Sequence, residues 1–356
     1  MRVGIFTELF APHVGGQEVR YAELAVALLE SGHSVDVYCI RHSASVPTQE
    51  VMAGVSVYRY PLAENYLRPF FKPLKRAIVP LLKYSLWVRR MARREDYDLM
   101  VFNQWPLAHV ALARKSARER VILDWCEVRD GLFYSTLMRR LPKLTRRNIA
   151  VSEAVANSVA SASGCHVEYI PSGVWLENYR CEDKSRRSGL AYLGRVTEHK
   201  NIGLLIDTFE RMRDEGYRGD LTIAGDGPSL PALKAGAEAS RHSSSIHFLG
   251  FVDDATKREI LACAEVLVVP SRREGFPRVV AEGMASGLPT VTVNFPENGT
   301  KTVVLQYGIG KVAEPDAGAL AGAIGDVLQD WETFSRNGLK HSKELDWNLL
   351  VKRLLA

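Results

Sequence analysis

Cysteine is scarce in this chain of 356 residues, and the few cysteines are scattered. There are five, an odd number, and none belongs to a C-x-x-C pair, which argues against a disulfide framework and against a zinc site. The chain also lacks an apolar run near the ~20 residues that cross a bilayer, and its start shows no secretory signal. We therefore expect a cytosolic protein that holds no metal ion.

The motifs of several cofactor-dependent enzyme classes are missing as well. Neither GGQEVR (15–20) nor GDGPSL (225–230) completes the G-x-G-x-x-G fingerprint of dinucleotide-binding proteins. The sequence has no Walker lysine pattern and no H-E-x-x-H motif. NAD-linked, kinase and metalloprotease chemistry therefore have no support, and we expect no cofactor.

Apolar strand-like runs recur along the chain, and helical stretches separate most of them. They lie at 2–7, 34–40, 55–60, 98–103, 120–125, 148–152 and 167–171, and again at 189–194, 221–225, 246–250, 266–270 and 288–293. Strands that are apolar on both sides and alternate with helices indicate a parallel sheet covered on both faces. Because the chain is long for one core, we predict an α/β protein of two doubly wound, Rossmann-like domains.

The polar stretch 179–188 is the expected linker, which divides the chain into domains at 1–178 and 179–340 and a helical end at 341–356. The first helix is expected to begin after Gly16 and to end at Gly32. Its predicted apolar face holds Ala22, Ala25, Val26 and Leu29.

Positive charge is concentrated in the first half. Residues 1–175 hold 23 Lys and Arg against 16 Asp and Glu, a net of +7, while 176–356 hold 23 against 25, a net of −2. Basic residues gather at 68–94 and at 139–147 among aliphatic side chains. This combination indicates docking on an anionic membrane, and the alternative is a buried helix with a solvated basic face. Nucleic acid is not an expected partner, because the basic runs match no binding motif.

Two carboxylates eight positions apart, Glu274 and Glu282, bracket the stretch EGFPRVVAE. This stretch follows an apolar run, and Pro277 stands where a helix is expected to begin. Glu274 is then on the loop after a strand, and Glu282 is between one and two turns into the helix. A helix N-terminus attracts phosphate and carboxylates accept bonds from hydroxyl groups, so the combination suits a nucleotide sugar.

EGFPRVVAE resembles the E-x7-E motif of the retaining glycosyltransferases of family 4, which have the GT-B fold. Four further stretches are similar to that family in order and spacing: GIFTELFAPHVGGQEVRYAELAVAL (4–28), LGRVTEHKN (193–201), LTIAGDGP (221–228) and IHFLGFV (246–252). The resemblance covers nearly the whole chain and is strongest over 189–294. It implies that the first domain binds the acceptor, the second binds the nucleotide sugar, and the final helix crosses back onto the first.

The resemblance also implies roles for residues. Arg195 and Lys200 would neutralise a diphosphate, Glu274 would hold the transferred sugar, and these three form the catalytic set. Glu282 would bind the ribose, and amides of the helix start would complete the phosphate site. The full set of expected donor-binding residues is Gly15, Gly16, Arg195, Lys200, Gly250, Phe251, Val252, Glu274, Gly275, Phe276, Pro277, Arg278, Val279 and Glu282.

Two segments depart from the family pattern. Related enzymes often carry a histidine where this chain has Cys126, with Glu127 as a polar substitute, and His13 is a further candidate on the acceptor side. Segment 294–300 lacks the usual Gly-Gly pattern, so its sugar contacts stay open.

We expect metal-independent sugar transfer with retention, from a UDP-sugar ahead of a GDP-sugar, to a lipid-linked acceptor or growing glycan at the inner face of the membrane. The alternatives are a soluble small-molecule acceptor, a nucleotide-sugar 2-epimerase of the same fold, and a catalytically inactive binding or docking subunit.

Overall fold

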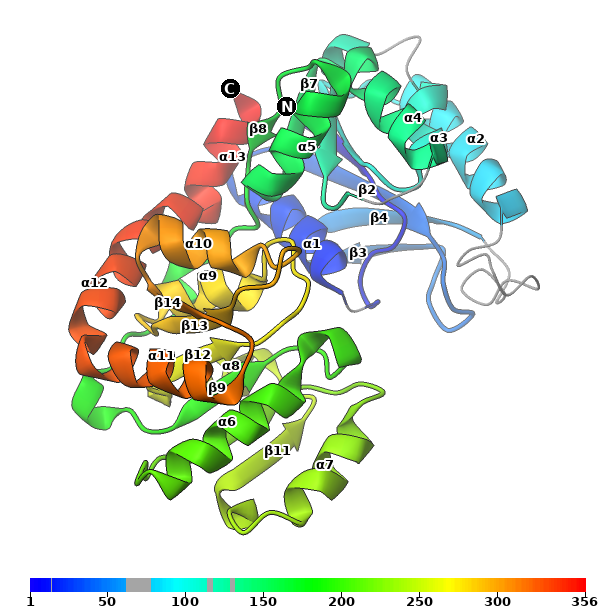
Figure 1. Cartoon of the computed structure of the whole chain (residues 1–356). Helices are drawn as coiled ribbons and strands as arrows, with labels where there is room; N and C mark the ends of the chain where they lie inside the picture. The colour runs from blue at the N-terminus through cyan, green and yellow to red at the C-terminus, as the bar shows by residue number, and fades with distance from the viewer. Residues whose placement is uncertain (14, 62–77, 114–117, 129–131) are drawn as a thin grey trace. The chain divides into compact units, whose positions relative to one another are not determined.

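The structure is a computed structural model that describes residues 1–13, 15–61, 78–113, 118–128 and 132–356 (Figure 1). The chain divides into two compact units, Met1–Gly173 with Trp347–Ala356, and Val174–Asp346. Each unit contains one twisted sheet with helices around it, and the two sheets share no strand.

The first unit has a sheet in the order β3-β4-β2-β1-β5-β6-β7-β8. Its strands are β1 (Arg2–Phe6), β2 (Ser34–Ile40), β3 (Gln49–Met52), β4 (Val55–Tyr60), β5 (Leu99–Asn103), β6 (Val121–Trp125), β7 (Arg147–Ala150) and β8 (Glu168–Tyr169). Only β3 runs antiparallel, paired with β4 at the edge. The helices are α1 (Gly16–Glu30), α2 (Ile78–Arg94), α3 (Leu107–Ala113), α4 (Leu132–Arg140), α5 (Glu153–Ser163) and α13 (Trp347–Leu355).

A column of aromatic rings runs across four strands of this sheet. Tyr58 stacks on Tyr38 with ring centroids 5.1 Å apart, Tyr38 on Phe6 at 5.0 Å, and Phe6 on Phe102 at 4.5 Å. These residues are register partners on β4, β2, β1 and β5. Stacked rings of this kind add to the stabilisation from burial alone, so the column ties the centre of the sheet together.

The inner face of α1 differs from the prediction, because it lies on other residues and includes the buried Arg20 and Tyr21. Of the four residues of the predicted face, only Ala25 is buried, and the helix instead buries Arg20, Tyr21, Leu24, Ala27 and Leu28. Arg20 Nε donates to Asp124 Oδ2 at 2.9 Å and its Nη2 donates to the Ile170 carbonyl at 2.9 Å. A buried guanidinium requires such partners, and a search for apolar periodicity passes over it.

The second unit has an all-parallel sheet in the order β11-β10-β9-β12-β13-β14. Its strands are β9 (Leu190–Leu193), β10 (Leu221–Ala224), β11 (Ile246–Gly250), β12 (Val266–Val269), β13 (Thr290–Val293) and β14 (Gly310–Ala313). Its helices are α6 (Ile202–Asp214), α7 (Leu230–Glu238), α8 (Asp254–Cys263), α9 (Arg278–Ala285), α10 (Thr300–Tyr307), α11 (Ala317–Gln329) and α12 (Trp331–Ser342). The core lies between β9, β12 and β13 and the buried faces of α6 and α11.

Residues 179–188, the expected linker, lie inside the second unit. The reason is Arg187, whose side chain is buried and donates to the carbonyls of Glu182, Leu261, Ala264 and Ser286. A charge-assisted bond of this type is stronger than a neutral one. The stretch is therefore fixed to the core, although its composition is that of a solvated loop.

The final helix, predicted from the sequence, is present as α13 and packs in the first unit. Trp347 is buried, and its Nε1 donates to Glu23 Oε2 on α1 at 3.0 Å. Arg147 Nη1 donates to the Leu354 carbonyl at 2.9 Å, at the other end of the helix. These contacts hold the end of the chain against α1 and β7.

The fold class predicted from the sequence, two doubly wound α/β sheets, is confirmed. Every predicted strand is present, whereas β3 and β14 were missed because QEVM and GKVA carry too few apolar residues to form a recognisable run. In the described parts of the chain, no helix combines the length and the apolar character needed to cross a bilayer.

His109 is a fully buried histidine in the first unit. Its Nε2 lies 2.7 Å from the Asn103 carbonyl oxygen, so Nε2 carries the hydrogen. Burial lowers the pKa of His109 from 6.5 to about 4, and the bond to Asn103 opposes the shift only in part. The imidazole is therefore neutral and serves the structure of the first unit.

We expect the stability of the first unit to fall as the pH drops from 6.5 to about 4. The unfolded state binds a proton at His109 that the folded state excludes, which costs at most roughly 1.4 kcal/mol per pH unit. His109→Gln keeps an N–H donor for Asn103 and should show a shallower pH dependence in urea unfolding. Equal slopes for the two proteins would contradict this assignment.

Candidate active site

The carboxyl ends of β9, β10 and β11 are tied together by backbone hydrogen bonds. Gly194 N donates to the Ala224 carbonyl at 3.0 Å, and Val196 N donates to the Asp226 carbonyl at 2.9 Å. Gly225 N donates to the Gly250 carbonyl at 2.7 Å. The predicted donor-side loops that carry Arg195 and Gly250 therefore meet at one edge of the sheet, where ligands of open α/β sheets bind.

The Gly225–Pro228 turn requires its glycines. Gly225 has φ +145°, and a Cβ there would lie 1.8 Å from the Gly194 carbonyl oxygen. Gly227 has φ +158°, and its Cβ would lie 2.2 Å from the Val196 carbonyl oxygen. Any side chain at either position would push the turn off the loop that carries Arg195.

Lys200 and Glu274 form an ion pair across this edge. The Lys200 ammonium contacts Glu274 Oε1, and Ser271 Oγ donates to the same oxygen at 2.8 Å. The two charged side chains are only 19% and 11% exposed. Lys200 ends a short 3-10 helix after β9, and Glu274 follows β12, so two expected catalytic residues are brought together.

The backbone of Glu274 is held by the loop after β13. Its N–H donates to the Glu297 carbonyl at 3.0 Å, and its carbonyl accepts from Gly299 N at 2.9 Å. Asn298, which is buried, fixes this loop by donating to the Val293 carbonyl at 2.8 Å and to Thr292 Oγ1 at 2.9 Å. Part of the segment 294–300 therefore acts as the support of Glu274.

Glu282 lies on α9 with its carboxylate almost wholly buried. The helix begins at Arg278, one residue later than predicted, and Pro277 is its N-cap with φ −73° and ψ 116°. Arg278 Nη2 donates to Glu282 Oε1 at 2.6 Å, and Lys257 Nζ donates to the same oxygen at 3.0 Å. Lys257 also contacts Asp254 Oδ1 at 2.9 Å.

These cations decide the charge of Glu282. Burial by itself would raise the pKa of the carboxyl group, but Arg278 and Lys257 outweigh it and hold the pKa below its ordinary value. Burial would likewise lower the pKa of Lys257, yet Glu282 and Asp254 raise it. Both groups therefore stay charged at neutral pH, and the carboxylate remains a hydrogen-bond acceptor.

Lys257 is a residue that the sequence analysis missed. It lies in the first turn of α8, whose N-cap Asp253 accepts from Thr256 N at 2.8 Å. In the sequence, Lys257 is visible as a basic residue one turn into the helix that follows β11. It was not recognised because Glu282 is 25 positions away in the sequence.

The other expected donor-side residues fall into two groups. Arg195, Gly275 and Phe251 are exposed at the strand ends, Phe251 to 74%. Phe276 and Pro277 are buried and pack under the start of α9, with Arg278 and Val279 in its first turn. First-turn amides of a helix have no carbonyl four residues back to bind, so the start of α9 presents donors suited to an anion.

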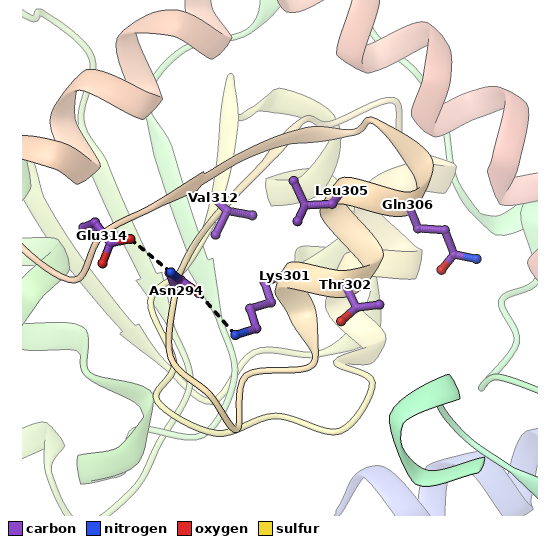
Figure 2. A pocket seen from close by; sticks show the side chains of 7 residues that line it. All are labelled: Asn294, Lys301, Thr302, Leu305, Gln306, Val312 and Glu314. Carbon is purple, nitrogen blue, oxygen red and sulfur yellow. Dashed lines mark hydrogen bonds between the residues drawn. The ribbon is translucent and has the colours of Figure 1, made fainter. Parts of the chain in front are cut away.

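An open pocket of about 670 Å³ lies beyond β12, at the carboxyl ends of β13 and β14 (Figure 2). Asn294 bridges two charged neighbours there, donating to Glu314 Oε1 at 3.0 Å and accepting from Lys301 Nζ at 3.2 Å. The remaining lining residues are Thr302, Leu305, Gln306 and Val312. The pocket is on the same edge of the sheet as Glu274, with polar groups that suit hydroxyl groups.

In the first unit, Cys126 lies at the end of β6 beside a closed polar network. Asn103 Nδ2 lies 3.5 Å from its Sγ and 2.9 Å from the Tyr21 hydroxyl, which donates to Asp124 Oδ2 at 2.9 Å. Burial raises the pKa of the Cys126 thiol well above its ordinary value, and Asp124 adds to the effect. The thiol is therefore protonated and is not an activated nucleophile.

The remaining acceptor-side candidates lie on loops at the same edge of the first sheet. Glu127 is half-buried directly after β6, and its N–H donates to Gln104 Oε1 at 3.3 Å. His13 Nδ1 lies 3.0 Å from Glu18 Oε1. Gly15 is the N-cap of α1 and Gly16 its first residue, as predicted for the turn after β1.

Comparisons with known proteins agree with this geometry. The family of glycosyl transferases group 1 matches residues 187–330, and the glycosyl transferase 4-like domain matches residues 15–173. Glycogen synthase of Mycobacterium tuberculosis is 33% identical over 374 residues, covering 95% of this chain and 89% of that protein. Phosphatidyl-myo-inositol mannosyltransferase of the same species is 23% identical over 376 residues, covering 100% and 96%.

Among solved structures, Anabaena Alr3699/HepE in complex with UDP and glucose superposes with a TM-score of 0.72 at 17% identity, covering 100% of this chain and 98% of that one. This likeness supports the GT-B fold that was predicted. The family matches and the 33% identity to glycogen synthase show that the chain belongs to the group 1, family 4-like glycosyltransferases, enzymes that take their sugar from a nucleotide-sugar donor.

Proposed function

We propose that this glycosyltransferase uses a UDP-sugar, transfers the sugar with retention of anomeric configuration, and needs no metal ion. The observation that carries the proposal is the pairing of two cations and two carboxylates at one edge of the second sheet, Lys200 with Glu274 and Lys257 with Glu282. Cations suit the diphosphate and carboxylates suit the hydroxyl groups of ribose and sugar. The second unit is accordingly the donor-binding unit, and the first binds the acceptor.

In the proposed reaction, the diphosphate leaves from the same face on which the acceptor hydroxyl arrives. Lys200, Arg195 and the first-turn amides of α9 stabilise the charge that develops on the leaving oxygen. That oxygen accepts the proton of the incoming hydroxyl. In this scheme Glu274 binds hydroxyl groups of the transferred sugar, and no covalent intermediate on a carboxylate is proposed.

The two carboxylates hold the donor at opposite ends. Oxygen Oε1 of Glu282 accepts from Arg278 and Lys257, so Oε2 is the oxygen proposed to accept from the ribose hydroxyls. Glu274 accepts from hydroxyls of the transferred sugar while Lys200 turns to the diphosphate.

The nucleotide and the acceptor are inferred from relatives. A solved relative was crystallised with UDP and glucose, which favours UDP over GDP. The mannosyltransferase and the Schizosaccharomyces pombe N-acetylglucosaminyltransferase subunit both have phosphatidylinositol in their names. We therefore propose a lipid-linked acceptor or a growing glycan at a membrane surface, ahead of a soluble acceptor.

UDP and UDP-sugars should raise the melting temperature of the protein, and GDP and GDP-sugars should not. A ligand at a hundred times its Kd stabilises the folded state by about 2.7 kcal/mol, which a thermal-shift panel detects. Stabilisation by GDP-sugars alone would reverse the nucleotide assignment. Proton NMR of the stabilising nucleotide sugar after incubation without acceptor separates the alternatives, because a 2-epimerase would change its stereochemistry without changing its mass.

Lys200→Ala should lower sugar transfer, measured as UDP release, by roughly a hundredfold or more, because the leaving diphosphate loses one of the two cations proposed to stabilise it. The melting temperature should change little, since Glu274 keeps its bond from Ser271. Lys340→Ala removes an exposed cation on α12 of the same unit and serves as the matched control. Near-normal UDP release by Lys200→Ala would refute the role.

Lys257→Met should weaken UDP binding about tenfold, because Glu282 loses one of the two cations that orient it. The catalytic constant should change little, since Lys257 does not contact the diphosphate in this scheme. Lys257→Arg restores the charge and should recover most of the affinity. Calorimetry of UDP binding and the split between KM and kcat test the assignment, which fails if kcat alone changes.

A further inference from the structure

We propose that one face of the first unit, formed by α2 and by the α4–Lys143 segment, docks directly on an anionic lipid bilayer. This proposal concerns a surface outside the donor site and therefore goes beyond the reaction proposed above. The proposed partner is a bilayer with negatively charged headgroups. The evidence is the exposure, the helical positions and the charges of side chains on α2 and at the end of α4.

The first observation is a stripe of exposed aliphatic side chains on α2. Val79 is 62% exposed, Leu82 50% and Leu86 55%. Their spacing of three and four residues places them on one side of the helix. The opposite side is buried in the core through Tyr84 and Val88, so the exposed stripe is not part of the hydrophobic core.

The second observation is that cations share this side of α2. Lys83, Arg90, Arg93 and Arg94 are exposed, and their helical positions fall on the same side as the apolar stripe. Within the described residues, none of them has a carboxylate partner. Aliphatic side chains inserted below lipid headgroups and cations placed at their level form the usual interfacial helix. Residues 68–77 of the predicted basic range lie outside the described residues.

The third observation is that folding brings the second basic cluster to the same layer. Arg139 and Arg140 end α4, and the 3-10 helix Leu141–Leu144 carries Lys143. All three are exposed. Helix α3 packs against both α2 and this 3-10 helix, so the clusters flank one helix, as Figure 1 shows at the upper right. Two segments about fifty residues apart in sequence therefore present their cations on neighbouring helices.

One residue of the predicted cluster does not belong to this face. Arg147 is bonded to Glu168 and donates to the carbonyls of Leu354 and Arg353, so it serves α13 instead. Of the acids that follow α2, Glu95 and Asp96 are paired with arginines outside this face, and Asp98 accepts from the Arg2 backbone N–H at 2.7 Å. Glu95 binds Arg2 at 3.0 Å, and Asp96 binds Arg120 at 2.9 Å.

An aliphatic stripe beside cations that lack a carboxylate partner among the described residues distinguishes a bilayer from other anionic partners. A nucleic acid offers phosphates but no hydrocarbon to cover Val79, Leu82 and Leu86, and its bases are usually met by aromatic side chains. The side chains of the stripe are aliphatic, which suits lipid chains. We therefore assign this face to a lipid bilayer, and binding of RNA in its place would contradict the assignment.

The test is co-sedimentation of the full-length protein with vesicles, either of phosphatidylcholine alone or of equal parts of phosphatidylcholine and phosphatidylglycerol. The protein should bind the anionic vesicles and release as ionic strength rises. Arg93→Gln/Arg94→Gln should lower the partition coefficient roughly 25-fold, at about fivefold per cation. Arg139→Gln/Arg140→Gln should have a similar effect, and Leu82→Ser/Leu86→Ser should lower it about tenfold.

Matched controls separate this face from general effects. Arg336→Gln/Lys340→Gln removes two exposed cations from α12, and Leu305→Ser/Leu349→Ser removes two exposed leucines elsewhere; both should bind vesicles like the unchanged protein. Equal binding to neutral and anionic vesicles, docking variants that bind normally, or binding of polyuridylate in place of vesicles would overturn the proposal. UDP-induced thermal shifts should persist in every docking variant, so failure of the docking proposal is distinguishable from failure of the proposed reaction.

Discussion

The parallel hydrogen-bond ladder of the second sheet is the constraint on which the active site depends. Because every neighbouring strand pair there is parallel, the carboxyl ends of all strands meet at one edge. Arg195, Gly225, Gly250 and Glu274 are spread over 80 residues, yet each follows a strand at that edge. The bonds from Gly194 to Ala224 and from Gly225 to Gly250 then fix the loops after β9, β10 and β11 to one another.

Charge pairing then determines what that edge can bind. A carboxylate that is buried without a partner takes up a proton or destabilises the fold. Glu282 avoids this through Arg278 and Lys257, and its lowered pKa keeps it ionised. Glu274 is held in the same way by Lys200 and Ser271, so both carboxylates are fixed in position by their neighbours. The Arg20–Asp124 pair of the first unit has a structural role. Arg20 also donates to the Ile170 carbonyl and Asp124 also accepts from the Tyr21 hydroxyl, so the pair holds α1 against β6.

The helices of the first unit show how one element can serve both the core and the surface. Tyr84 and Val88 of α2 pack into the aromatic core, and the Tyr84 hydroxyl donates to the Thr7 carbonyl at 2.6 Å at the end of β1. The outer side of the same helix is aliphatic and cationic. Helices that cover a sheet turn their outer sides toward solvent. On α2 this outer side exposes aliphatic side chains, whose contact with water is unfavourable.

Strand positions and the E-x7-E stretch could be read from the sequence because they depend on local pattern. Runs such as SVDVYCI and VSVYRY are rich in β-branched and aromatic residues, and β2 and β4 match them residue for residue. Contacts between distant residues left no such pattern. Lys257 binds Glu282, and Arg20 on α1 binds Asp124. Arg187 anchors residues 179–188, and the two basic clusters lie on neighbouring helices. Each of these arrangements joins positions that lie far apart in the chain. Sequence alone determined the elements and the chemistry available at their ends; the tertiary structure decided which charges face one another, because a buried charge is set by its neighbours in space and not by those in the chain.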